Sequence, residues 1–113
     1  MNERGREAER QAAKLLEDQG LRIVERNWRC RFGEIDLVAR DGSTLVFVEV
    51  RARTSRSFGG AAESIGFAKR RKLIAAANLY LAARRLDAAC RFDAVLIEAD
   101  GNMRWVRDAF SAD

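Results

Sequence analysis

The stretch GEIDLVARDGSTLVFVEVRAR, residues 33 to 53, contains two runs of alternating residues on either side of one turn signal. Both the run from Glu34 to Arg40 and the run from Thr44 to Arg53 have the period of two that is typical of β-strands. Asp41-Gly42 between them is a common hairpin turn. The stretch therefore predicts a β-hairpin, and the length of its loop decides which side chains lie opposite one another.

The hairpin carries two carboxylates whose proximity depends on that loop. A loop of two or four residues within Asp41 to Thr44 places Asp36 beside or diagonal to Glu49, whereas a three-residue loop separates them. Adjacent carboxylates raise each other's pKa unless a cation lies between them. Two interpretations are open: a hard divalent cation such as Mg²⁺, or ion pairs with Arg51 and Arg53 on a solvated face of the sheet. A charged Glu49 inside the apolar run LVFVEV favours a functional role, since an unpaired charge is costly there.

The remainder of the chain predicts two helices and three further strands. The helices are expected over Glu3 to Gln19 and from about Ala62 to Arg85, and the strands over Leu21 to Trp28, Arg91 to Ala99 and Met103 to Val106. This order predicts an α/β fold with a mixed central sheet flanked by helices. A chain of 113 residues with 48% hydrophobic content has the usual size of one domain, so residues 1 to 113 are expected to form a single domain.

Composition excludes several kinds of chemistry. The chain contains no histidine, which removes Ser-His-Asp and Cys-His hydrolysis and histidine-ligated zinc sites. Its 21 Lys and Arg against 17 Asp and Glu give a net charge of +4, which suits either a polyanionic partner or an ordinary solvated face. Carboxylates, Lys or Arg and a metal ion are the groups left for catalysis.

Two further features concern the protein's environment. No run of apolar residues is long enough to span a bilayer, and the charged start MNERGREAERQ is unlike a secretory signal, so a cytoplasmic protein without membrane contact is expected. Cys30 and Cys90 have neither metal-type nor redox-type spacing. We expect both to be reduced residues that pack in the protein.

Several motifs together resemble a known family. The spacing of three residues resembles the PD-(D/E)xK nuclease signature: Glu49 follows Asp36 after a gap of twelve residues, and Arg51 follows Glu49 after a gap of one. The whole chain resembles the YraN family of small bacterial proteins, which have a restriction-endonuclease-like fold similar to that of archaeal Holliday-junction resolvases. The resembling pieces are AERQAAKLL around Glu9, RNWR at 26 to 29, GEIDLVARD at 33 to 41, LVFVEVRAR at 45 to 53, FGGAAESI with Lys69 following, and RFDAV at 91 to 95.

The resemblance implies a magnesium- or manganese-dependent endonuclease that hydrolyses DNA, with branched DNA as its substrate and a homodimer as its assembly. Asp36 and Glu49 would hold the metal, and the backbone carbonyl of Val50 would complete its shell. Glu9 matches an acidic residue on the first helix that supports such sites, although a solvated glutamate explains it equally well from the sequence. Glu34 is a lesser candidate.

Arg51 departs from the nuclease signature, which most often has lysine at this position. Arginine stays protonated, so it can stabilise phosphate charge but cannot accept a proton. Lys69 is a candidate for the missing amine, or else a lysine whose stem lies along the apolar side of the second helix. A nucleic-acid-binding module without catalysis is therefore the alternative function. A protein-interaction domain whose carboxylates form only ion pairs is a third.

Basic residues interleave with aromatic ones in ways that suit phosphate binding. These residues are Arg26, Trp28, Arg29 and Arg31, then Arg53 and Arg56 before Gly59-Gly60, and the run KRRK from Lys69 to Lys72. Phosphate contacts give affinity with little sequence information, which suits a structure-selective binder. Four consecutive basic residues spread around a helix, however, so only some of the run can face one ligand, and a tryptophan is more often a packing residue than a base-stacking platform.

Overall fold

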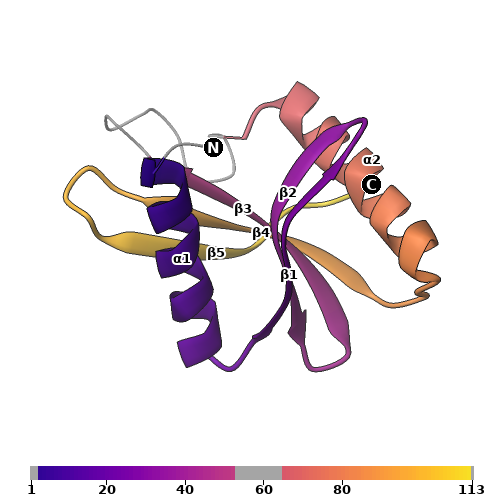
Figure 1. Ribbon diagram of the computed structural model, residues 1–113, viewed down its shortest axis with the longest axis horizontal. Helices are drawn as coiled ribbons and strands as arrows, with labels where there is room; N and C mark the ends of the chain where they lie inside the picture. Colours follow the sequence, from indigo (N-terminus) through magenta and orange to yellow (C-terminus); the bar gives the residue numbers. More distant parts are fainter. Residues whose placement is uncertain (1–2, 53–64, 113) are drawn as a thin grey trace.

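A computed structural model describes residues 3–52 and 65–112 and contains two helices and five strands in these ranges (Figure 1). Their order, a helix, three strands, a helix and two strands, is the one predicted. The elements are α1 (Glu3–Asp18), β1 (Arg22–Cys30), β2 (Gly33–Asp41), β3 (Thr44–Ala52), α2 (Phe67–Arg84), β4 (Cys90–Ile97) and β5 (Met103–Phe110).

The five strands form one sheet in the order β1-β2-β3-β4-β5. Neighbouring strands are antiparallel except β3 and β4, which are parallel and are separated in the chain by α2. A parallel pair needs such a crossover, because the chain must return to the same end of the sheet. The predicted α/β class with a mixed sheet is confirmed, and the arrangement is compatible with a restriction-endonuclease-like fold.

The two helices cover opposite faces of the sheet (Figure 1). One core cluster joins α1 to one face and includes Leu16, Leu37 and Val48. The other joins α2 to the opposite face and includes Phe47 and Tyr80. Consecutive residues of β3 enter the two clusters in turn, as the alternation of a central strand requires. Each large apolar side chain buried in this way contributes roughly 1.5 to 3 kcal/mol.

Two elements differ in length from the sequence-based expectation. Helix α2 begins at Phe67 rather than near Ala62, because Gly66 has an extended backbone with φ −66° and ψ 164°; Ala62 itself lies outside the described residues. Strand β5 continues past Val106 to Phe110. Phe110 is buried against Phe92 in the cluster under α2, and this contact extends the strand by half its length.

The two cysteines are free, as expected, but only one of them packs against the core. Cys30 is half-buried beside the cluster under α2. Cys90 is exposed, so its predicted packing role is wrong; it stands at the first position of β4, where its thiol donates to the carbonyl of Ala88. In residues 3–52 and 65–112, neither helix has the length and apolar character needed to cross a membrane.

Candidate functional site

The loop of the β2–β3 hairpin has the length that brings Asp36 and Glu49 together. Asp41 pairs with Thr44, which leaves a two-residue loop, and the ladder continues to Leu37 opposite Val48. At the next step along the hairpin, Asp36 Oδ2 accepts a hydrogen bond from the N–H of Val50 at 2.8 Å. An even loop was one of the two possibilities that the sequence left open, and the register confirms it.

The side chains of β2 stop alternating regularly between the two faces of the sheet at Asp36. Ile35 belongs to the core cluster under α2, whereas Leu37, two residues later, belongs to the cluster under α1. Residues two apart share a face in a regular strand, so the backbone turns over at the residue between them. On the neighbouring edge strand, Asn27 has φ 51°, a left-handed conformation that asparagine tolerates better than most residues. Asp36 therefore lies where groups from both faces of the sheet can reach it.

The Asp36 carboxyl is protonated at neutral pH when no cation is present. Burial raises its pKa from 3.8 to about 9, helped by the hydrogen bond to the Glu49 carboxyl and by the negative charges of Glu49 and Glu9. The N–H of Val50 acts in the opposite direction and lowers it. Since two neighbouring ionised carboxylates repel, Asp36 keeps its proton.

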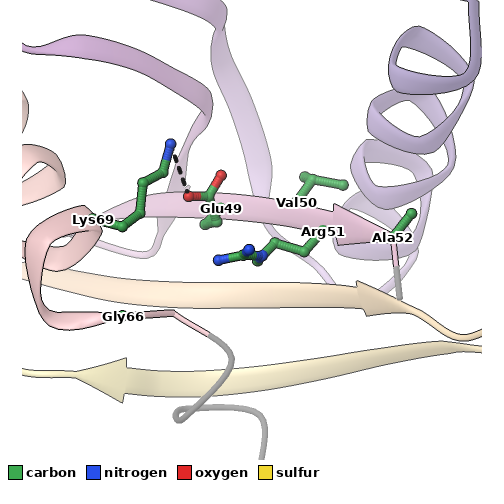
Figure 2. Close-up of a pocket in the computed structure, with 6 residues that line it drawn as sticks. All are labelled: Glu49, Val50, Arg51, Ala52, Gly66 and Lys69. Carbon is green, nitrogen blue, oxygen red and sulfur yellow. Dashed lines mark ion pairs between the residues drawn. The ribbon is translucent and has the colours of Figure 1, made fainter. Parts of the chain in front are cut away.

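Glu49 has an oxygen atom that lacks a hydrogen bond. Its side chain is 7% exposed, and its Oε2 is the buried side-chain atom without a hydrogen-bond partner among the described residues. Lys69 Nζ lies 3.4 Å from this oxygen and forms an ion pair with it (Figure 2). A buried acceptor left in this state is costly. The donor set of Asp36 and Glu49 consequently fits a hard divalent cation, which binds oxygen ligands.

A second acidic group adjoins Asp36 on the α1 side. One carboxylate oxygen each from Glu9, Glu34 and Asp36 lies within 4.8 Å of the others. The side-chain amide of Asn27 joins two of these residues, donating to Glu9 Oε1 at 2.7 Å and to Glu34 Oε1 at 3.1 Å. Glu9 is half-buried and its carboxylate points toward the sheet, which is one of the two orientations that the sequence left open. The bridging Asn27 is a site residue that the sequence analysis missed.

Two depressions meet at the end of β3. One, of about 440 Å³, lies on the α2 side and is lined by Arg51, Gly66 and Lys69; the other, of about 350 Å³, lies on the α1 side and is lined by residues that include Glu9 and Asp36. Both share Glu49, Val50 and Ala52. The carboxylates therefore stand between two hollows, and Val50, the third metal-binding residue that the resemblance implied, lines both.

Arg51 and Lys69 are the cations of the α2-side depression. Lys69 is half-exposed, and its ammonium reaches Glu49 from the first turn of α2. The guanidinium of Arg51 extends along β3 toward Glu49 (Figure 2). No residue in the described ranges forms an ion pair or hydrogen bond with Arg51. Its charge is thus available to a ligand.

Most of the other predicted basic and aromatic residues have partners within the protein. Trp28 packs edge-on against Tyr80, with ring centroids 5.3 Å apart, which is the packing role the sequence favoured. Arg29 pairs with Glu34, Arg31 stacks on Phe32, and Arg71 stacks on Phe67. Arg26 lines a small hollow with Arg6 and Arg10 next to Glu9. Arg53, Arg56 and Gly59-Gly60 lie outside the described residues.

A buried carboxylate on β4 has a structural role. Asp93 is fully buried and accepts hydrogen bonds from Arg91, the indole N–H of Trp105 and the backbone N–H of Asp108, at distances of 2.8 to 3.0 Å. Arg91 also pairs with Asp41, across to the end of β2. The signal in the sequence was a charged residue inside the apolar run RFDAVLI.

Comparisons with known proteins identify the family of the chain. The model of the uncharacterised protein family UPF0102 matches residues 8–97. The chain belongs to the UPF0102 family. The YraN proteins that the motifs resemble are the same family. The matched range contains the site residues from Glu9 to Lys69, and it also contains Asp93.

Curated UPF0102 proteins align with nearly the whole chain. The one from Dechloromonas aromatica (strain RCB) is 56% identical over 110 residues, which cover 97% of this chain and 90% of the relative. The one from Methylobacillus flagellatus is 54% identical over 115 aligned residues, covering 99% and 100% respectively. The one from Nitrosospira multiformis is 52% identical over 109 residues, covering 95% and 92%.

Proposed function

We propose that this UPF0102 protein is a divalent-metal-dependent phosphodiester hydrolase that acts on DNA. The observation that carries the proposal is the pair Asp36 and Glu49, in which burial beside a second carboxyl raises the pKa of Asp36 and one buried oxygen of Glu49 has no hydrogen bond. A cation bound between the two carboxylates would replace the proton on Asp36 and would give the buried oxygen of Glu49 a partner. Asp36 and Glu49 would hold Mg²⁺ or Mn²⁺, with the carbonyl of Val50 as a further ligand. When bound, the ion would supply positive charge at a phosphate and would make a nearby water more acidic.

Two cationic side chains, Lys69 and Arg51, lie beside the carboxylates and can act on a bound phosphate. Lys69 Nζ stands beside Glu49, on the wall of the same depression as Arg51. Lysine can exchange a proton with a reacting group, whereas arginine remains protonated and stabilises charge on the phosphate. We therefore propose that Lys69 supplies the amine that the signature lysine of PD-(D/E)xK nucleases supplies from the position of Arg51. Glu9, held by Asn27, keeps negative charge next to Asp36 and so favours cation binding.

DNA is the proposed substrate because the carboxylates are flanked by arginines and lysine that suit a chain of phosphates. Arg6 and Arg26 line the hollow beside Glu9, while Arg51 and Lys69 line the hollow beside Glu49. Contacts to phosphate carry little sequence information, which suits recognition by DNA shape. Branched DNA and a homodimer are proposed on the resemblance alone, and the cytoplasmic location stays a prediction from the sequence.

One observation favours a second function, a nucleic-acid-binding module that does not cleave. Arg51 stands where the nuclease signature has lysine, and Lys69 is engaged with Glu49 in the absence of a metal. If this ion pair persists with DNA bound, no side chain of the site exchanges a proton. Binding with strong salt dependence and no metal-dependent product would identify this function.

The test combines calorimetry with Mn²⁺ and cleavage of branched and single-stranded DNA. The unmodified protein should bind Mn²⁺ at a saturable site, and Glu49→Gln should bind it at least tenfold more weakly and cleave nothing. Lys69→Met should retain the metal and lose cleavage about 10²-fold, because it removes a group that acts on the reacting phosphate.

Glu17→Gln, which makes the same chemical change on the exposed side of α1, is the matched control and should behave like the unmodified protein. Equal Mn²⁺ affinity in Glu49→Gln and the control would contradict the metal site. Intact metal binding with full cleavage by Lys69→Met would instead remove Lys69 from the mechanism.

Metal affinity should rise with pH. Since the pKa of Asp36 is raised to about 9 in the metal-free protein, its carboxyl is protonated across the neutral range and must release that proton when a cation binds. The apparent Mn²⁺ affinity should therefore increase by up to about tenfold per pH unit between pH 6 and 8.5, with about one proton released. Calorimetry in buffers of different ionisation enthalpy measures both quantities. An affinity that does not vary with pH would contradict the raised pKa of Asp36.

A further inference from the structure

Helix α2 begins without the side chains that normally complete a helix N-terminus. The residue before it is Gly66, which offers no capping oxygen, and the first turn contains no acidic residue. It contains Lys69 and, directly after it, Arg70. Helix starts ordinarily carry a side-chain acceptor and negative charge, since the first N–H groups have no partner in the helix and the dipole is positive there. The start of α2 is thus unusually rich in positive charge.

The N–H groups of this first turn have no acceptor in the part of the chain that is described. The first intrahelical bond runs from the N–H of Arg70 to the carbonyl of Gly66 at 3.0 Å. Within residues 3–52 and 65–112, no group accepts a hydrogen bond from the N–H of Phe67, Ala68 or Lys69. A Cβ at Gly66 would meet nothing within 4 Å. Crowding therefore does not explain the missing cap.

The helix start faces the candidate metal site. Gly66 and Lys69 line the same depression as Glu49 and Arg51, and Figure 2 shows them around the end of β3. Glu49 contributes the buried Oε2 that has no hydrogen bond. One hollow thus contains a positive helix end, two cationic side chains and a carboxylate with a buried oxygen that has no hydrogen bond. A phosphate group next to a divalent ion satisfies all of them.

We propose that the N-terminus of α2 is a phosphate-binding subsite. The N–H groups of Phe67, Ala68 and Lys69 donate to the oxygens of one phosphate, and the Lys69 ammonium neutralises it. The source of the phosphate, a backbone phosphodiester of DNA, rests on the proposed function. The subsite itself rests on the geometry of α2. It deepens the proposed function because it holds the substrate chain from the side of the sheet opposite to Glu9.

Substitutions at Gly66 separate helix capping from phosphate binding. Gly66→Asn and Gly66→Asp both supply a capping oxygen, so both should raise the melting temperature by about 1 to 3 °C. Only Gly66→Asp adds negative charge at the subsite, and it should weaken binding of a fluorescent ten-nucleotide single-stranded DNA about tenfold. Gly66→Asn should change this affinity less than threefold. Asn78→Asp, with the same change of charge on an exposed part of α2, should also change it less than threefold.

The binding measurement is made in EDTA, so that it does not depend on the metal site. A tenfold loss confined to Gly66→Asp supports the subsite even if Mn²⁺ titration of Glu49→Gln later rejects the metal centre. Equal affinity of Gly66→Asp and Gly66→Asn overturns the subsite, while the proposed function can still stand on metal binding and cleavage. Equal losses in Gly66→Asp and Asn78→Asp also overturn it, because net charge then explains the effect.

A second measurement on the unmodified protein covers the case in which the Gly66 variants fail to fold. Inorganic phosphate should shift the backbone amide NMR signals of Phe67, Ala68 and Lys69 more than those of the rest of α2. Shifts spread over the exposed lysines and arginines without these amides would overturn the proposal. Oligonucleotides with and without a 5′-phosphate should bind equally if the backbone phosphodiester is the ligand. Preference for the 5′-phosphate would assign the subsite to a terminal phosphate and overturn the assignment to the backbone.

Discussion

Asp36→Asn should stabilise the metal-free protein and at the same time abolish its cation site. With a pKa of about 9, Asp36 must take up a proton when the chain folds at neutral pH. The native state then binds more protons than the unfolded state, so the free energy of unfolding falls as pH rises from about 4 toward 9. Asparagine avoids this cost, because its oxygen can accept from Val50 and its amide can donate to Glu49. We expect a gain of about 1 to 3 kcal/mol at pH 7.5.

Melting curves in EDTA at pH 5 and pH 8 measure this effect. The difference in melting temperature between Asp36→Asn and the unmodified protein should widen as pH rises, to about 4 to 12 °C at pH 8. Mn²⁺ should reverse the order, because it stabilises only the protein that binds it. Asp87→Asn, an exposed residue before β4, is the matched control and should show neither effect. Destabilisation by Asp36→Asn at pH 8 would show that the carboxyl is ionised and well paired.

Asp93→Asn should destabilise the protein strongly. Asp93 has no exposed surface, and both of its oxygens accept hydrogen bonds from Arg91. Replacing one oxygen with an NH₂ group places a donor against the guanidinium and leaves the half-buried Arg91 charge with Asp41 alone. Breaking a buried ion pair from one side costs about 3 to 5 kcal/mol. The melting temperature should therefore fall by about 10 to 20 °C.

Urea unfolding of Asp93→Asn and of the exposed control Asp87→Asn distinguishes this network from an ordinary surface charge. The midpoint should fall markedly only for Asp93→Asn, with an unchanged dependence on urea concentration. Among the described residues, Asp93 accepts its hydrogen bonds from Arg91, Trp105 and Asp108 and makes none with Asp36 or Glu49. The folded variant should accordingly bind Mn²⁺ with unchanged affinity. A loss below 1 kcal/mol would contradict the structural role.

The order of the helices and strands and the presence of the hairpin could be predicted from the sequence, because the patterns that indicate them involve only residues close together along the chain. Alternation over residues 33 to 53 and the Asp41-Gly42 turn predict the two strands, and the turn limits the loop to a few lengths. The proximity of Asp36 and Glu49 was therefore predictable up to the parity of the loop. The ends of β5 and α2 were not, because the burial of Phe110 and the extended conformation of Gly66 depend on segments distant in sequence.

By itself the sequence determined the α/β class, the order of helices and strands and the identity of the two central carboxylates, since periodicity and turn chemistry are local properties. Only the tertiary structure decided that Glu9 and Lys69 reach these carboxylates from helices on opposite faces, that Asn27 bridges Glu9 to Glu34, and that Asp93 is buried in a network of its own. The direction of a side chain at the edge of a helical stripe is ambiguous in sequence. It becomes definite only when the helix is packed on the sheet and burial makes every unpaired polar group costly.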